Sequence, residues 1–230
     1  RALILVYGST TYSFSAMLSV FLAGIAIGST VFSRLAGAIK RPVFWFAVTQ
    51  IGSGLCMVLA LYRFNSQPEF LLQYLLKHGL VWRNLLAAQF MITLSLLFLP
   101  TFFFGGAFVM AAKALRERSE SSSRATGQLY AFNTIGAMAG ALAAGFALLP
   151  VVGMERAILA LAILAVAAGL VFVFRSGASA AAVRAVAGAV VVCLAVSVMR
   201  PPALNEKILS SGAYFGAWNF LRNGKVALLD

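Results

Sequence analysis

The sequence predicts an all-α fold, a polytopic bundle of six transmembrane helices that also retains the tail of an earlier helix. Of its 230 residues, 62% are hydrophobic and only 10% are charged, whereas a soluble domain carries roughly 25% charged residues. The apolar residues fall in runs of about 20, the length of helix that crosses the hydrocarbon core. These runs are too uniformly apolar for barrel strands, which alternate. Helices are therefore expected, because a backbone in hydrocarbon must satisfy its own hydrogen bonds.

Each apolar run ends at charged residues, glycine or proline, and each predicts one span. The sixth run has only 15 apolar residues, so it crosses the core only if Arg184 snorkels and the helix begins near Ala178. Arg1 to Tyr7 predicts the tail of an earlier helix. The six runs are Thr11 to Phe32, Val43 to Tyr62, Leu85 to Ala112, Gly127 to Leu149, Ala157 to Phe174 and Ala185 to Met199.

Two prolines and one polar segment refine this picture. Pro100 should kink the third helix, because proline removes a backbone hydrogen bond and crowds the preceding turn. Pro150 should stop the fourth helix. The segment from Pro68 to Trp82 predicts a short amphipathic helix in the outer interface. Residues 1–200 thus form the predicted membrane domain, and residues 201–230, with a possible strand at Lys225 to Asp230, a linker into a truncated soluble domain.

The net charge of +12 is interpreted as a topology signal. Nine of the basic residues follow the first, third and fifth runs, which places those loops in the cytoplasm. A nucleic-acid partner is not expected, because the cations lie at the ends of apolar runs and form no separate basic domain. The predicted setting is the lipid bilayer of the cytoplasmic (bacterial inner) membrane. The nine residues are Arg34, Lys40, Arg41, Lys113, Arg116, Arg118, Arg124, Arg175 and Arg184.

Polar groups within the spans form the candidate site. An intramembrane polar side chain either joins helices or lines a path for a solute. Gly24 with Gly28, and Gly136 with Gly140, are candidate helix-packing pairs, because small residues let helices approach closely. Packing within the chain is the simpler interpretation, and a substrate path along these faces is the alternative. A homo-oligomer stays open as a partner of the chain. The candidate polar residues are Gln50, Gln128, Tyr130, Asn133 and Thr134.

Several chemistries find no support in the residues. No carboxylate lies in the middle of a span, which weakens a carrier of cations or one coupled to protons. His78 is the only histidine and there are two cysteines, so neither a metal site nor a disulfide scaffold is expected. No paired-carboxylate site or glycine-rich nucleotide loop is present. We therefore expect no catalytic residue and no cofactor in this chain.

Two stretches at helical positions resemble one known family. Gly8 to Gly28 (GSTTYSFSAMLSVFLAGIAIG) resembles the second membrane helix of spermidine-synthase-like membrane proteins, also described as fused MFS-like/spermidine synthases. Leu99 to Ala112 (LPTFFFGGAFVMAA) is similar to that family's P-T-x-x-M-G-A-T-x-P-type run. It departs from this run at Phe104, Ala107 and Val109.

The longest match lies in the fourth run. Gly127 to Gly153 is similar to the family's G-x-L-Y-x-x-N-T-x-G-A-x-x-G-x-x-x-x-G-F-x-L-L-P-x-x-G, including Asn133, Gly136 and Gly140. Leu209 to Tyr214 resembles the S-S-G-x-Y that precedes the family's catalytic domain. The resemblance implies an MFS-like half-bundle that anchors an aminopropyltransferase-like domain, this chain's own C-terminal soluble partner. That domain would use decarboxylated S-adenosylmethionine, and its catalytic residues would lie beyond Asp230.

Three functional interpretations stay open. The first is the membrane domain of such a protein, which anchors the transferase and handles its substrate or product. The second is an MFS-like module that transports a small solute, and the third is a structural membrane subunit. With the basic loops inside, six spans leave Asp230 outside, whereas decarboxylated S-adenosylmethionine is cytoplasmic. Either the sixth run does not span, or the soluble domain acts outside on something else.

Overall fold

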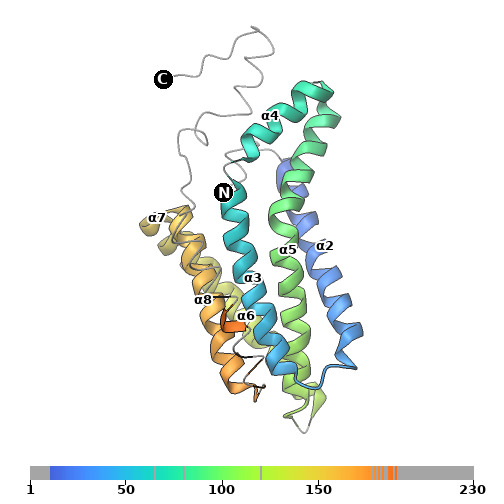
Figure 1. Cartoon of the computed structure of the whole chain (residues 1–230), viewed down its shortest axis with the longest axis vertical. Coiled ribbons are helices and arrows are strands. Elements are labelled where there is room, and N and C mark those ends of the chain that lie inside the picture. The colour runs from blue at the N-terminus through green and yellow to red at the C-terminus, as the bar shows by residue number, and fades with distance from the viewer. Residues whose placement is uncertain are drawn as a thin grey trace. The chain divides into compact units, whose positions relative to one another are not determined.

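The computed structural model describes residues 11–64, 66–79, 81–119 and 121–177, together with 179, 181, 183, 186–188 and 190. In this part of the chain every regular element is a helix, and no strand is present. The elements, shown in Figure 1, are α2 (Thr11–Ala36), α3 (Pro42–Phe64), α4 (Gln67–His78), α5 (Trp82–Arg116), α6 (Ser122–Leu142), the π-helical turn η1 (Ala143–Leu148), α7 (Leu149–Val152) and α8 (Met154–Arg175).

Five helical segments are long and apolar enough to cross a membrane, which indicates an integral membrane protein. They correspond to the first five predicted runs and extend a few residues beyond them, because polar residues at the ends of a span remain helical. Most of the sixth run lies outside the described residues, as do residues 1–10 and 201–230. The five segments are Phe14–Ala36, Pro42–Phe64, Trp82–Arg116, Ser122–Val152 and Met154–Arg175.

The prediction that Pro150 stops the fourth helix was wrong by about one turn. The chain passes through the π-helical turn η1 and continues as α7 to Val152. Pro150 is tolerated because it lies in the first turn of α7, where its missing N–H has no intrahelical partner to lose. The helix ends instead at Gly153, whose φ of 82° is a left-handed conformation that favours glycine.

The helix α5 is longer than a span requires. Its 35 residues correspond to roughly 52 Å at 1.5 Å per residue, against about 30 Å of hydrocarbon. It remains one helix through Pro100, whose side chain is buried. Lys113 and Arg116 lie in its last turn, so basic residues mark the end that extends beyond the apolar segment.

The chain divides into two compact units. Among the described residues, the first unit holds 11–21 and 60–98, and the second holds 22–59 and the described part of 99–201. In the first unit the amphipathic helix α4 buries Leu71 and Leu75 against α5 and exposes Gln73 and Lys77. The amide of Asn84 donates to the carbonyl oxygens of the α4–α5 turn at 2.6 and 3.1 Å. The predicted short helix is therefore present as α4.

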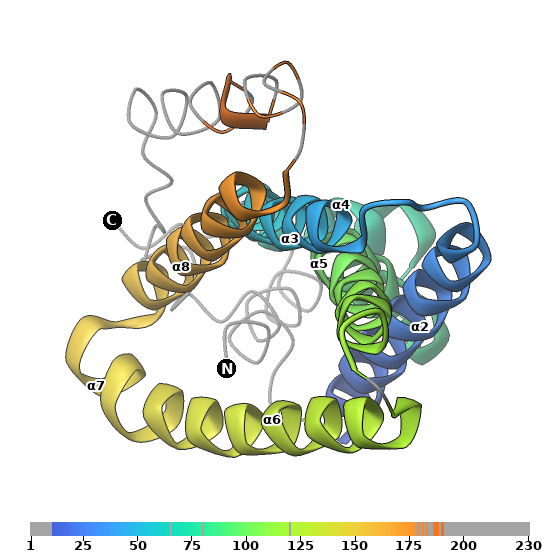
Figure 2. The same cartoon turned by 90° about the horizontal axis from the view of Figure 1, so that it is seen from below.

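The second unit is built on two close helix pairs. In one, α2 and α5 run parallel, and the backbone at Gly28 lies directly against the backbone at Phe102. In the other, α3 and α8 run antiparallel: Gly54 faces the carbonyl of Ala162, and Gly169 faces that of Ala47. Figure 2 shows α8 beside α3 and α6 on another side of this unit. Small residues thus bring both pairs into backbone contact, where van der Waals packing is densest.

Candidate functional site

The predicted polar residues of α6 share one feature, which is exposure. Gln128, Tyr130, Asn133 and Thr134 are all exposed among the described residues. Among the described residues, Tyr130 forms a T-shaped ring pair with Phe108, whose centroids are 5.5 Å apart. The structure therefore places these four side chains on one helix without assembling them into an enclosed site.

Gln50 lies elsewhere, half-buried on α3. Among the described residues, no hydrogen bond joins its side chain to the polar residues of α6. The hydroxyls beside it bond to backbone carbonyls instead: Thr49 donates to Phe46 at 2.8 Å and Ser53 to the Gln50 carbonyl at 2.8 Å. Every buried polar side chain in the described part has a hydrogen-bond partner. Gln50 and Asn133 thus stay separate candidates.

The two predicted glycine pairs occupy different environments. Gly24 and Gly28 are buried on α2, and Gly28 meets α5 at Phe102. Gly136 and Gly140 are exposed on α6, with no described atom within 4 Å of the position of an added Cβ. The first pair lies at a helix contact, whereas the second lies on a helix face that no described residue covers.

One face of α6 combines Asn133 with these glycines. At 3.6 residues per turn, Asn133, Gly136 and Gly140 lie within about 60° of one another around the helix axis, and Gln128 lies about 140° from Asn133. An amide is costly in hydrocarbon unless a protein group or water satisfies it. The Asn133 face is therefore suited to a partner helix or a polar path, and not to lipid chains.

Two surface hollows in the described part of the chain are similar in size, and one lies in each unit. The hollow in the first unit, about 490 Å³ in volume, lies between the end of α3, α4 and α5. Its two charged residues are Arg63 and Glu69, which have opposite signs, so its charge selects neither cations nor anions. Its lining residues are Arg63, Ser66, Gln67, Glu69, Phe70, Gln73, Met91, Ile92 and Ser95.

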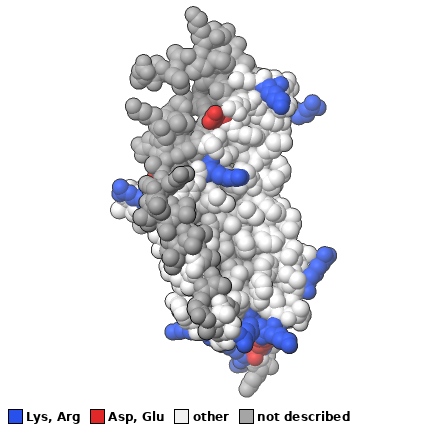
Figure 3. All heavy atoms as spheres, viewed as in Figure 1, with Lys and Arg blue, Asp and Glu red and all other residues white. Residues whose placement is uncertain are grey.

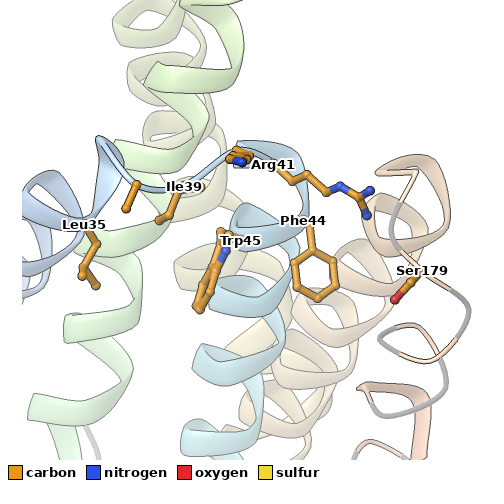
Figure 4. Close-up of a pocket in the computed structure, with 8 residues that line it drawn as sticks. Leu35, Ile39, Arg41, Phe44, Trp45 and Ser179 are labelled. Atoms are coloured by element: carbon orange, nitrogen blue, oxygen red, sulfur yellow. The ribbon is translucent and has the colours of Figure 1, made fainter.

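The hollow in the second unit, about 500 Å³ in volume, lies at the turn between α2 and α3 and differs in charge. Lys40 and Arg41 are its only charged lining residues, and both are exposed. Figure 4 shows Leu35 and Ile39 on one side of it and Phe44 and Trp45 along the first turn of α3. The lining residues are Leu35, Ala38, Ile39, Lys40, Arg41, Phe44, Trp45 and Ser179.

The turn that carries this hollow is held in place by Lys113 of α5. Its ammonium group donates to the carbonyl oxygens of Ala36 at 2.5 Å and Ile39 at 2.6 Å. Ala36 is the last residue of α2, and its carbonyl also accepts from the N–H of Ile39 at 3.3 Å. Ile39 lies in the turn that follows. Lys113 also lies 3.7 Å from Glu117. Because Lys113 satisfies the end of α2, Lys40 and Arg41 are not needed for that purpose.

Cations gather at the end of the second unit where this hollow lies. Figure 1 shows α2, α5 and α8 ending there, and their last turns hold Arg34, Lys113, Arg116 and Arg175. Figure 3 shows the corresponding group of basic side chains at the lower end of the visible face. This arrangement is what the positive-inside prediction requires of the three loops.

Comparison with known proteins gives no family. No family model, curated protein or solved structure matches the chain. The described part also lacks any group of three or more His, Cys, Asp or Glu residues placed to hold a metal ion. Interpretation of the site therefore rests on the residues and their geometry, and the resemblance to spermidine-synthase-like proteins rests on the motifs in the sequence.

The basic hollow was not predicted from the sequence. Lys40 and Arg41 were interpreted there only as a topology signal. The available signal was a basic pair followed, after one proline and one valine, by the aromatic pair Phe44 and Trp45. The sequence does not predict that Leu35 and Ile39 lie beside these residues. Their position depends on how the α2–α3 turn folds.

Proposed function

We propose that this chain is the membrane domain of a spermidine-synthase-like protein, which anchors an aminopropyltransferase-like domain at the bilayer. The observation that carries the proposal is the motif from Gly127 to Gly153, which matches the family in both its polar and its small positions. Five apolar helices of spanning length support a membrane role.

Helix packing explains glycines in two of the three stretches that resemble the family, and not in the third. Gly28 ends the first stretch and faces Phe102, which lies in the second, and Gly105 of the second stretch faces Ser29. Close packing of α2 on α5 thus accounts for Gly28, Gly105 and Gly106 in these two stretches. The third stretch, on α6, has no such explanation among the described residues, because Asn133, Gly136 and Gly140 are exposed. We assign to that face a helix contact that the anchoring role requires.

The anchoring role is tested with the native gene and its product. We expect the coding sequence past Asp230 to encode a strand and a glycine-rich loop within about 100 residues, as in a nucleotide-binding Rossmann domain. Membranes that contain the full product should form methylthioadenosine from decarboxylated S-adenosylmethionine and an amine. Membranes that contain only residues 1–230 should hold the inserted protein and form none. A coding sequence that ends at Asp230, or methylthioadenosine from residues 1–230 alone, would refute the proposal.

A second candidate function, transport of a small solute, is favoured by the exposed amide of Asn133. In proteoliposomes, uptake of a polyamine, amino acid or nucleoside should disappear in Asn133→Leu if this face lines the path. Gln128→Leu is the matched control, because Gln128 is exposed on the opposite side of the same helix. Equal transport by both variants and the parent, or no transport of any of these solutes, would count against this function.

A further inference from the structure

The basic hollow at the α2–α3 turn combines cations with an apolar wall. Lys40 and Arg41 line it, and no carboxylate does. Neither cation has a hydrogen-bond or ion-pair partner among the described residues. Ile39 is buried, whereas Leu35 is 48% and Trp45 39% exposed. A ligand that fits this surface carries a negative charge at one end and hydrocarbon at the other.

The backbone adds to the positive charge. The helix α3 begins at Pro42 and has no acidic residue in its first turn. The N-terminus of a helix has a partial positive charge and favours anions. Two cations directly before that end are unfavourable for the helix itself, so α3 gains nothing from Lys40 and Arg41. An anion between them and the first turn would be stabilised by both cations and by the helix dipole.

The position of the hollow identifies the source of the anion. It lies between two spanning segments, one ending at Ala36 and the other beginning at Pro42, so it lies where the hydrocarbon meets the headgroups. Exposed Trp45 has the amphipathic ring that prefers this depth. Basic pockets between membrane helices at this level bind phosphate-bearing headgroups. A free phosphate would use the cations but leave Leu35, Ile39 and Trp45 without a role.

We propose that this hollow binds an anionic glycerophospholipid. Lys40 and Arg41 pair with its phosphate, and an acyl chain lies along Leu35, Ile39 and Trp45. The hydrogen bonds from Lys113 to Ala36 and Ile39 hold the turn in shape, so the site exists before the lipid binds. This proposal does not depend on the aminopropyltransferase-like domain.

The test is a lipid titration of the purified full chain in detergent. Phosphatidylglycerol and phosphatidylcholine with the same acyl chains are added, and bound lipid is measured by native mass spectrometry. The parent protein should prefer phosphatidylglycerol. Lys40→Gln with Arg41→Gln should lower the affinity for phosphatidylglycerol about fivefold for each cation, or roughly 25-fold together. The affinity for phosphatidylcholine should fall much less, because the positive charge of choline offsets the charge of its phosphate.

The control is Arg116→Gln with Arg118→Gln, which removes the same charge from exposed residues outside the hollow. It should lower the affinity by less than about twofold, because Arg116 and Arg118 do not line the hollow and act on the bound lipid only through a field that salt screens. Equal losses in both double variants, or no preference in the parent, would overturn the site. Far-ultraviolet circular dichroism and thermal unfolding should show that both variants fold, so that a lost preference reports on the lipid.

A third arm separates a lipid from a soluble phosphate. Glycerol phosphate at millimolar concentration should not displace phosphatidylglycerol, and Leu35→Gln should weaken lipid binding while Lys40 and Arg41 remain. Displacement by glycerol phosphate, together with no effect of Leu35→Gln, would assign the hollow to a soluble anion and overturn the lipid proposal.

Discussion

Replacement of Gly28 by alanine tests the packing of α2 on α5 most directly. An added Cβ would lie 2.8 Å from the carbonyl carbon of Phe102 and closer still to its oxygen. Ordinary contacts between carbon atoms are about 3.5–4.0 Å, so the two helices must separate by about 1 Å. The obstacle is backbone and not a flexible side chain, so rotation about a side-chain bond cannot relieve it.

The magnitude follows from two opposing effects. Overpacking of this kind costs about 1–3 kcal/mol, and separation of the helices also loosens the neighbouring contact of Gly105 with Ser29. The higher helix propensity of alanine opposes this loss and stabilises the helix by up to about 1 kcal/mol relative to glycine. We expect Gly28→Ala to lower the free energy of unfolding by about 1–2 kcal/mol.

The matched control is Gly136→Ala, at the centre of α6. No described atom lies within 4 Å of its added Cβ, so the propensity effect alone should raise stability by up to about 1 kcal/mol. Both variants are unfolded in mixed micelles by titration with sodium dodecyl sulfate, and helix loss is followed by circular dichroism. If Gly28→Ala is as stable as the parent, the assigned α2–α5 contact is wrong.

Three further predictions use the same unfolding titration. Lys113→Met should destabilise the protein by about 2 kcal/mol, because hydrogen bonds from a charged donor to Ala36 and Ile39 are lost. The control, exposed Arg116→Met, should change stability by less than about 0.5 kcal/mol. Equal effects of the two substitutions would contradict the role of Lys113. Gly153→Ala should lower the free energy of unfolding by about 1 kcal/mol, because the φ of 82° at Gly153 is left-handed. Gly127→Ala, within α6 and uncrowded, should not lower it. Unchanged stability of Gly153→Ala would mean that the turn relaxes freely. Pro150→Ala should change the free energy of unfolding by less than about 0.5 kcal/mol, because Pro150 lies in the first turn of α7. A larger change would show that η1 depends on the proline.

The spans could be predicted from the sequence because run length and hydrophobicity are local properties. Both are sufficient to locate the five spanning segments to within about five residues at each end. The error at Pro150 has a local cause as well: a proline that ends one helical segment is also tolerated in the first turn of the next. The π-helical turn η1 joins α6 to α7, and no residue pattern in Ala143–Leu148 predicts it.

The helix contacts were less predictable than the helices. Gly24 with Gly28 and Gly136 with Gly140 have the same spacing, yet Gly28 lies against Phe102 whereas Gly136 meets no described atom. The spacing of the glycines shows that a helix face carries small side chains. It does not show whether another helix lies against that face. The basic hollow depends in turn on Lys113, which is distant in the chain from the turn that it holds. The chemistry of Lys40 and Arg41 was therefore visible in the sequence, but their pocket was not.

The bond from Lys113 has a consequence for the order of synthesis. Its acceptors Ala36 and Ile39 precede it by 77 and 74 residues, so α2, the turn and all of α3 leave the ribosome long before the donor exists. The hairpin of α2 and α3 enters the bilayer while the Ala36 carbonyl has only the N–H of Ile39, at 3.3 Å, and the Ile39 carbonyl is left to water. Only when the last turn of α5 arrives does the ammonium replace that water. The α2–α3 turn therefore reaches its final form late, and a nascent chain stopped before Lys113 should leave it solvated.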